Sequence, residues 1–534
     1  MEAYRQYRRI EHSVQQQIRH TASPTPSELE SNATLSNDDK SDNNSDDNKD
    51  DEKQIIVDFN EKDTANDPTQ WTIRRKLWTT LQIWLLVFVA GWASASTSTS
   101  HKVAAKALHV SGLAESLGTA MYLFGVAFGA VFAGPMSETV GRLPTYLGTF
   151  FVYLIWLMAS ALAPNFGAQI VFRGLAGFFA ASSMSIYGGS LADMFPEKGS
   201  RASVWPWFAL SPLLGPVISP VPSGWVTQYL GWRWVEWLNL IISGAVFVMA
   251  LLFLPETSSN VILKVKAKLL VKNTGDNRYV AKGDEDGDSI GAMLGDHLQR
   301  MAYFIFRELT TLLFGLYLTL LYVLVYGFLH GFEFLFTDTY RFNTGQNYSA
   351  FAAIAIGILL GLPYVLVVNK IVRSRNNGEQ GQEEQRLIPA LIPSVLLTIS
   401  MFWIGWTDRP DISDWSVLGA CVLFGFSVMA LFTTTYHYLI DAYGTAASSA
   451  LCAATFMRYL ASGGMVIATE PLYKAIHVEW TMTLLGCVAG LLTPVPWIFW
   501  WSGSKLREKS KYAVGGGDDS KDEKDDSKDE QDDN

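Results

Sequence analysis

The sequence predicts an all-α integral membrane protein with 12 transmembrane helices arranged as two six-helix bundles. Hydrophobic residues make up 49% of the 534 positions. They gather in runs of about 20 residues, and a helix of that length covers the ~30 Å hydrocarbon core of a bilayer. A polar stretch separates six early runs from six late ones. The runs are 77–97, 115–134, 144–163, 167–188, 203–222, 235–254, 309–335, 350–370, 387–406, 415–436, 449–472 and 480–501.

The net charge of −10 is concentrated at the ends of the chain. Residues 37–53 and 518–534 hold almost no apolar side chains, so they cannot bury enough surface to offset the entropy of ordering. A layout of six runs, a linker and six runs is typical of transporters built from repeats. We expect a disordered cytoplasmic N-terminal tail (1–70), an N-terminal bundle (71–255), a cytoplasmic central linker (256–307), a C-terminal bundle (308–502) and an acidic disordered tail (503–534).

Lysine and arginine are divided unevenly between alternate loops. One set carries Arg74-Arg-Lys76, Arg142, the basic residues of the central linker and the cluster 370–375, whereas the alternate loops carry far fewer. Basic residues accumulate on the cytoplasmic side, so both termini and the linker are expected there. The first 70 residues contain no apolar core segment of a cleavable signal peptide. Asn347 begins a glycosylation sequon in an external loop, although its closeness to the eighth run argues against its use.

Several classes of function find no support in the sequence. Cys421, Cys452 and Cys487 lie in apolar runs without metal-ligand spacing, so we interpret them as buried free thiols. There is no Walker loop, nucleotide fingerprint or Gly-x-Ser-x-Gly elbow. We therefore expect no ATP-driven pump and no enzyme. We also expect no catalytic residue, no metal, no cofactor and no nucleic-acid partner.

Arg173 is a charged residue within the fourth run. A charge at the centre of a membrane helix costs ~2.5–3.5 kcal/mol on insertion scales, so it needs a compensating role. Its neighbours in 171–177 are small, which lets it face the bundle interior and pair with an acid, with backbone carbonyls or with water. It is either a functional residue or a structural arginine that locks helices together.

Glu333 lies among aromatic residues in the seventh run. Desolvation there favours the protonated carboxyl, which would let it load and release a proton. His330 is one turn earlier on nearly the same face and is a candidate relay. The alternative is that Glu333 lies in the external headgroup zone and stays ionised.

Other charged residues are expected near helix ends. Asp441 follows the tenth run and is interpreted as a gate or helix-end contact, with Arg458 of the eleventh run as its partner. Glu236 begins the sixth run and is expected to pair with Arg233. Glu470 is near the external end of the eleventh run.

Two glycine-containing segments indicate moving parts. Gly134, Glu138, Gly141 and Arg142 lie in a short segment between two spanning runs, which is expected to form a loop that latches one conformation. In the fifth run, Gly215, Pro216 and Pro220 are expected to bend the helix and to allow close approach to another helix. Close packing and a rocking hinge both fit this spacing.

Aromatic residues are abundant, with 18 Trp, 21 Tyr and 30 Phe. Many belong to interfacial belts. An aromatic pocket with one buried acid would suit flat, apolar or weakly cationic compounds. The candidates for lining it are Tyr122, Phe124, Tyr187, Phe328, Phe332 and Phe334.

Taken as a set, these motifs resemble the major facilitator superfamily, and within it the fungal twelve-span drug:proton antiporters of the azole- and benomyl-resistance subgroup. The segment Gly134–Arg142 is similar to the family's loop between spans two and three. Arg173 with Gly177 is similar to the fourth-span motif assigned to proton transfer. The segment Gly215-Pro216 with Pro220 resembles the fifth-span antiporter motif. Leu254-Pro-Glu-Thr257 resembles the start of the subgroup's linker, and Glu333 matches an acid that the subgroup tends to carry.

The resemblance covers residues 67–512 and implies a major facilitator fold. It also implies a plasma-membrane exporter, expected to be monomeric, that exchanges protons for cytotoxic drugs by alternating access. The chain departs from the family where Ser211 and Ser219 replace glycine and where Glu236 and Glu470 add acids. These acids leave open uptake of polyamines or other organic cations and nutrients on the same fold. A non-transporting sensor or scaffold that works through the acidic tails is a further alternative.

Overall fold

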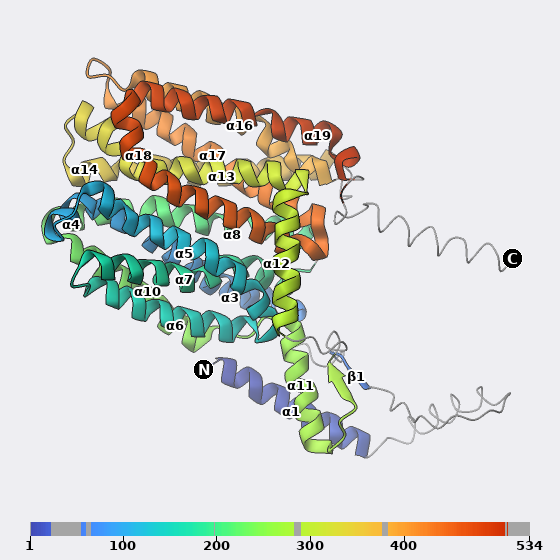
Figure 1. Cartoon of the computed structure of the whole chain (residues 1–534). Helices are drawn as coiled ribbons and strands as arrows, with labels where there is room; N and C mark the ends of the chain where they lie inside the picture. The colour runs from blue at the N-terminus through green and yellow to red at the C-terminus, as the bar shows by residue number, and fades with distance from the viewer. Residues whose placement is uncertain are drawn as a thin grey trace.

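The computed structural model describes residues 2–22, 55–59, 66–196, 198–281, 290–375, 383–507 and 510. Eleven helical segments among them are long and apolar enough to cross a membrane, which confirms the all-α membrane fold (Figure 1). The acidic runs 37–53 and 518–534 lie outside the described residues. That they are disordered therefore stays a prediction.

The first half of the chain supplies six spans. They are α3 (Ile73–Ser96, continued by η2, Thr97–Ser100, and α4, His101–Ala107), α5 (Gly112–Thr139), α6 (Arg142–Ala161), α7 (Phe166–Met194), α8 (Lys198–Ile218) with α9 (Pro220–Leu230), and α10 (Trp232–Phe253). Two of these helices begin with a side-chain cap. The Ser111 hydroxyl accepts a hydrogen bond from the Ala114 amide at the start of α5, and the Asn165 side chain accepts one from the Ala168 amide at the start of α7.

The second half supplies α13 (Leu309–Phe332, continued by η3, Glu333–Thr339), α14 (Thr344–Ser349) with α15 (Phe351–Arg375), η4 (Glu383–Leu387) with α16 (Ile388–Thr407), α17 (Asp414–Tyr443), η5 (Gly444–Ala446), α18 (Ala447–Leu492) and α19 (Pro494–Arg507). The eleventh predicted run, 449–472, falls within α18, and the twelfth, 480–501, begins in α18 and ends in α19. His477 breaks this segment with a left-handed backbone (φ 59°), so α18 consists of two helices joined by a kink. Each of the 12 predicted runs therefore corresponds to a helix.

The same contact between helices occurs in both halves. A Cβ at Gly125 of α5 would lie 2.1 Å from the Gly174 carbonyl oxygen of α7, and one at Gly357 of α15 would lie 2.1 Å from the Val422 carbonyl oxygen of α17. Only glycine allows backbones to approach this closely. The second and fourth spans of each half are thus packed alike, as expected of two related bundles.

The helix of the fifth span is interrupted in the segment where its sequence predicts a bend. The helix passes from α8 to α9 at Ser219, and Pro220 occupies the first position of α9. A Cβ at Gly215 would lie 2.6 Å from the Phe88 carbonyl oxygen, while Pro216 packs against Gly91 of α3. These contacts show close packing between α3 and α8.

The N-terminal tail contains ordered structure, contrary to the expectation for 1–70. Helix α1 (Glu2–Ala22) buries Ile10 and Val14 in a cluster with Ile262 of α11 (Ser259–Thr274). Strand β1 (Ile55–Val57) pairs in parallel with β2 (Tyr279–Ala281). Although α1 is polar on average, its few apolar residues lie along one face and can be buried. The average composition of residues 1–70 did not reveal this face.

The linker also forms helices, α11 and α12 (Ile290–Phe306). Helix α12 packs against α5 of the first half and against α13 and α18 of the second. We call the side of the bundle that carries α12 and the turn at Gly141 the linker face. The other end, which carries α4 and α14 at the left of Figure 1, is called the opposite face.

We predict that Gly215→Ala separates α3 from α8 and destabilises the fold. Overpacking of this kind costs ~1–3 kcal/mol, because the added methyl group meets backbone atoms rather than a flexible side chain. Thermal unfolding in detergent measures the effect. Gly148→Ala is the matched control, because a Cβ at Gly148 meets nothing within 4 Å. Equal melting temperatures for the two variants would contradict the prediction.

Candidate functional site

A cavity of about 230 Å³ lies between the two halves towards the linker face. Tyr187 and Trp205 line it from the first half, Tyr436 and Cys452 from the second, and His297 from α12. The lining also includes Glu138 and Arg142, small residues at helix ends, and Met184. The site is therefore formed jointly by both bundles and the linker.

Stacked aromatic rings form one wall of the cavity. The Tyr187 ring lies 6.1 Å from that of Trp205 at an interplanar angle of 18°, and the Trp205 ring lies 6.1 Å from that of Tyr436 at 24°. The wall crosses from α7 and α8 to α17. A flat apolar compound could stack on it. Sequence reasoning missed Trp205 and Tyr436, because neither is distinguished by spacing from aromatic residues elsewhere in the spans.

Of the six aromatic residues predicted to line a pocket, Tyr187 lines this cavity. The hydroxyl of Tyr122 donates to the Ala90 carbonyl oxygen at 2.9 Å, and its ring lies beneath the Arg173 guanidinium. Phe124 packs where Gly463 of α18 makes room. These two residues join helices and are not among the cavity lining.

The other three predicted aromatic residues lie in the second half. Phe328 and Phe332 are buried and their rings lie 5.1 Å apart, with Phe332 also 4.4 Å from the ring of Phe351. Phe334 stacks on Tyr473 at 5.2 Å. These three residues pack between helices and do not line the cavity. The sequence could not show this, because tertiary packing decides which side of a span meets its neighbours.

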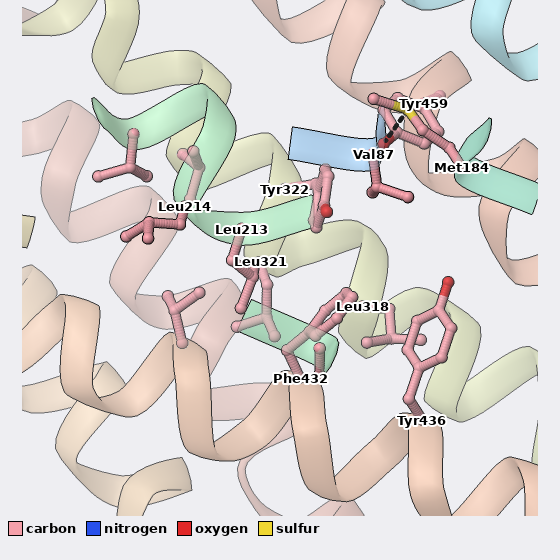
Figure 2. Close-up of a cluster of buried hydrophobic side chains, with 14 of the residues drawn as sticks. Val87, Met184, Leu213, Leu214, Leu318, Leu321, Tyr322, Phe432, Tyr436 and Tyr459 are labelled. Atoms are coloured by element: carbon pink, nitrogen blue, oxygen red, sulfur yellow. Dashed lines mark hydrogen bonds between the residues drawn. The ribbon is translucent and has the colours of Figure 1, made fainter. Parts of the chain in front are cut away.

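The centre of the molecule, above the cavity, is closed by apolar packing between the halves (Figure 2). Leu213 and Leu214 of α8 belong to the same buried cluster as Leu321 of α13, and Figure 2 shows the Tyr459 hydroxyl bonded to the sulfur of Met184. The latter contact measures 3.2 Å and joins α18 to α7. A solute in the cavity is thus separated from the opposite face.

Most of the segment Gly134–Arg142 is helical rather than a loop, since α5 continues to Thr139. The turn is confined to Val140 and Gly141, where Gly141 has φ 115°. Arg142 donates to Asp193 at 3.2 Å and to Ser137 at 2.5 Å. Because α6 starts at Arg142, directly after Gly141, two residues are enough to connect α5 to α6. The pattern of apolar residues in the sequence does not show how short this connection is.

Glu256 fixes the same turn from the start of the linker. Its carboxylate accepts from the backbone amides of Arg142 (3.1 Å) and Leu143 (3.0 Å), at the N-terminus of α6. Burial raises the pKa of Glu256, while the bonds from backbone amides oppose that shift. Gln6 of α1 bonds to the Glu256 backbone in both directions. The N-terminal helix is thereby connected to the cavity mouth.

The opposite face is closed by polar contacts between the halves. Lys102 of α4 lies 2.6 Å from the Glu333 carboxylate, and His101 lies 3.6 Å from it. The Tyr348 hydroxyl donates to the Ser98 carbonyl oxygen at 3.3 Å. We call the pair Lys102–Glu333, with its neighbours His101 and Tyr348, the outer latch.

The surroundings of Glu333 are therefore more polar than its aromatic sequence neighbours indicate. Its carboxylate meets Lys102, His101 and the Tyr348 hydroxyl, which lie on other helices. His330 is buried with its ring 4.6 Å from that of His101, edge to face. The sequence predicted Glu333 and His330 as one site because they lie one turn apart in the seventh run. It gave no indication that His101 and Lys102, which precede the second span, would join them.

Helices α9 and α14 reinforce this closure. The backbone amide of Gly345 donates to Gln228 at 2.9 Å, and the indole of Trp225 donates to Ser349 at 2.9 Å. Asn347 lies in α14 with 1% of its surface exposed. In this conformation its amide is inaccessible to modification.

Arg173 is 1% exposed and faces the interior of the first half. It donates to the Thr97 hydroxyl at 2.6 Å and to the Ala93 carbonyl oxygen at 3.1 Å. Its ion-pair partner is Glu236, 3.8 Å away. The expected pairing of Glu236 with Arg233 is wrong, because α10 turns Glu236 inward while Arg233 bonds to the Ala163 carbonyl oxygen.

Arg458 and Asp441 do not form the expected pair. Arg458 is enclosed by tyrosine and phenylalanine rings, 4.2 Å from the Tyr322 centroid, and donates to the Tyr436 hydroxyl at 2.9 Å. Asp441 pairs instead with Arg386 of η4 at 3.1 Å. Arg458 lies about three turns inside α18, whereas Asp441 lies at the end of α17, so their depths differ.

The cysteines are free, as predicted, but only Cys421 and Cys452 are buried, whereas Cys487 is exposed. Cys452 lies at the cavity, where its sulfur is 3.8 Å from that of Met301 in α12. His297 of α12 is 3.4 Å from the Ser449 hydroxyl. Helix α12 therefore covers part of the cavity mouth.

Comparison with known proteins agrees with this fold. Residues 83–466 match the sequence profile of the Major Facilitator Superfamily, and the chain belongs to that superfamily. The "MFS-type transporter kojT" of Aspergillus oryzae is 42% identical over 465 residues, covering 85% of this chain and 82% of the relative. The "Citrinin biosynthesis cluster MFS transporter mrr1" of Monascus ruber is 30% identical, covering 85% and 92%. The protein is thus a multi-pass membrane transporter.

Solved structures share the architecture at low sequence identity. The proton:xylose symporter XylE superposes with a TM-score of 0.61 at 15% identity, covering 80% of this chain and 96% of XylE. The human organic anion transporter MFSD10 superposes with a TM-score of 0.54 at 16% identity, covering 79% and 99%. These likenesses confirm the major facilitator fold.

We predict that acid loosens α12 from the cavity mouth. Burial, and secondarily the charge of Arg300, lowers the pKa of His297, so the docked ring is neutral. A released imidazole takes up a proton below about pH 6.5. Docking is therefore strongest above that pH and weakens as the pH falls through it. Alkylation of Cys452, measured in a Cys487→Ala background, reports the release.

The matched control is His297→Gln, which keeps a polar side chain without the titration. The ratio of the Cys452 alkylation rate with His297 to the rate with Gln should rise as the pH falls from about 7.5 to about 5.5. The ratio cancels the change in thiolate fraction common to both proteins. A ratio that is constant with pH would refute the docking role of His297.

Proposed function

We propose that this protein exports apolar or weakly cationic xenobiotics, including azole- and benomyl-like compounds, across the plasma membrane in exchange for protons. The observation that carries the proposal is a cavity shared by both halves towards the linker face, while the opposite face is closed. Such a one-sided arrangement is one of the two states that alternating access requires. The cavity lies within one chain, so a monomer has the complete pathway.

The distribution of basic residues supports an inward-facing assignment of this conformation. The linker face carries Arg142, Arg373 and Arg375. An excess of basic residues is typical of cytoplasmic loops, which favours a cytoplasmic location for this face. Both termini are then cytoplasmic. A compound would enter the cavity from the cytoplasm and leave after the outer latch opens.

The lining supports an apolar substrate over a polycation. Glu138 is the acid among the described residues that line the cavity, and the guanidinium of Arg142 lies in the same lining. A polyamine with several ammonium groups would lose hydration without matching carboxylates. A flat compound with at most one positive charge would instead use the wall of Tyr187, Trp205 and Tyr436. Polyamine uptake is therefore the less favoured alternative.

The name of one relative favours a second candidate substrate. The transporter of Monascus ruber is named for the citrinin biosynthesis cluster. Export of a metabolite made by the cell itself would use the same cavity and direction. A metabolite and a foreign drug differ in origin rather than in the chemistry of recognition.

We assign proton coupling to Arg173, Glu333 and His330, and gating to the charged and glycine-containing contacts. Protonation of Glu333 from outside would remove its attraction to Lys102 and open the outer latch. At the linker face, Arg142 with Asp193, and Asp441 with Arg386, would rearrange when the cavity closes. Glu138 and Gly134 line this mouth, Gly141 forms its turn, and Arg458 with Gly215, Pro216 and Pro220 support the moving helices.

Inside-out membrane vesicles with an imposed pH gradient test the function. A radiolabelled azole should accumulate when the vesicle interior is acidic, because outward proton flow then drives inward movement of the drug. Dissipating the gradient with a protonophore should abolish accumulation. Equal accumulation with and without the gradient would refute proton coupling. Vesicles from cells lacking the protein are the control.

Exchanging the two charges of the outer latch tests its role. Lys102→Glu or Glu333→Lys alone places like charges together, so each should lower the transport rate by keeping the rim open. The double variant restores an opposite pair and should recover most of the rate. A partly exposed ion pair contributes ~1 kcal/mol at most, so transport is a better readout than stability. No recovery in the double variant would argue against an electrostatic latch.

A further inference from the structure

Arg458 of α18 is a buried cation without a carboxylate partner. It is 1% exposed, and in the part of the chain that the structure describes no acidic side chain forms an ion pair with it. Its guanidinium donates to the Tyr436 hydroxyl at 2.9 Å. Aromatic faces surround it, and these attract a cation but carry no net charge. The positive charge of Arg458 is therefore uncompensated, unlike that of Arg173, which pairs with Glu236.

Arg458 lies at the inner end of the cavity. The residues of α18 that line the cavity recur every three or four positions and so form one stripe of the helix: Ser448, Leu451, Cys452 and Thr455. Arg458 follows Thr455 by three positions and continues this stripe away from the linker face. Tyr436, to which Arg458 donates, lines the cavity from α17. The guanidinium is therefore joined to the cavity wall by a direct hydrogen bond.

Hydrogen-bonding groups of the cavity lining lack partners at this end. The Trp205 indole N–H and the Tyr187 hydroxyl are buried, and neither has a hydrogen-bond partner among the residues described. An indole N–H can only donate, so it needs an acceptor. Tyr436 accepts from Arg458 and keeps its own hydrogen to donate, either to the Thr455 hydroxyl at 3.2 Å or to a ligand. Because a buried donor without an acceptor is unfavourable, these groups favour a ligand with acceptor atoms.

The charged residues at the cavity mouth do not offset Arg458. Glu138 and Arg142 line the mouth near the ends of α5 and α6, whereas Arg458 lies about three turns inside α18. Arg142 is already paired with Asp193. Asp441, at the end of α17, is paired with Arg386 of η4. A negative charge beside Arg458 therefore has to come from the ligand.

We infer that the cavity takes flat organic acids as a further class of substrate and binds them as anions beside Arg458, with Tyr436 and Trp205 donating to the anionic oxygens. The inference rests on the proposed export through this cavity and adds a substrate class to it. The stacked rings of Tyr187, Trp205 and Tyr436 select a planar ring system. The guanidinium selects a carboxylate or phenolate, because charge-assisted hydrogen bonds are stronger than neutral ones.

Binding of β-naphthoate and of its neutral analogue β-naphthamide to the purified full-length protein tests the inference. The two probes share the same planar rings and differ in charge at about pH 7.5, where a carboxylic acid is ionised. Wild-type protein should bind naphthoate about tenfold more tightly than naphthamide. Arg458→Gln should remove this preference. Arg458→Lys should retain part of it, since lysine keeps the charge without the planar fork.

Arg233→Gln is the matched control, because it removes one arginine charge outside the cavity, where Arg233 bonds to the Ala163 carbonyl oxygen. It should bind both probes as wild-type protein does. Equal affinities of wild-type protein for the two probes would overturn the inference, as would an undiminished preference in Arg458→Gln or a lost preference in the control.

Trp205→Phe supplies a second test that leaves Arg458 in place. It keeps an aromatic ring in the wall and removes the indole N–H, so it should weaken naphthoate binding by about tenfold. Should Arg458→Gln fail to fold, unchanged naphthoate affinity in Trp205→Phe would overturn the inference.

The binding experiment is independent of the proposed drug export, because it uses neither an azole nor a pH gradient. Gradient-driven azole accumulation by a protein that binds the two probes equally would refute only the organic-acid class. A preference for naphthoate that depends on Arg458, in a protein without gradient-driven azole accumulation, would refute only the proton-coupled export of drugs.

Discussion

The hydrocarbon core of the bilayer supplies no water, so every ionisable group placed in it needs a partner from the protein. This constraint organises the first half of the chain around Arg173, which binds Thr97, the Ala93 carbonyl oxygen and Glu236. The same constraint is met differently in the second half, where Arg458 lies among aromatic rings and bonds to Tyr436. One buried cation is paired with a carboxylate, whereas the other is matched to aromatic rings and a hydroxyl. The two halves therefore stabilise their buried arginines by different chemistry.

The two faces are held together by different chemistry, which suits alternating access. At the opposite face, an ion pair between Lys102 and Glu333 joins the halves. At the linker face, charged pairs such as Arg142 with Asp193 lie within one half, while α12 bridges both. Packing in the centre, around Leu213, is mainly apolar. Two hydrogen bonds cross it, from the Tyr322 hydroxyl to the Pro212 carbonyl oxygen and from the Tyr459 hydroxyl to the Met184 sulfur.

The linker and N-terminal helix add a layer that the membrane fold alone does not require. Gln6 bonds to the backbone of Glu256, whose carboxylate caps α6 beside the cavity mouth. Helix α12 places His297 in the cavity lining. The linker and α1 are therefore part of the surroundings of the cavity mouth and not only connections between the bundles.

The sequence by itself determined the spanning helices, the two halves and the inward orientation of Arg173, because hydrophobic length and the cost of a buried charge are properties of local sequence. It also determined the close packing at Gly215, since glycine and proline act through the backbone. Only the tertiary structure decided that Glu236 pairs with Arg173, that Glu333 meets Lys102, and that Tyr187 rather than Phe332 lines the cavity. Those contacts join helices far apart in the chain, and periodicity does not fix how neighbouring helices are rotated or at what depth they meet.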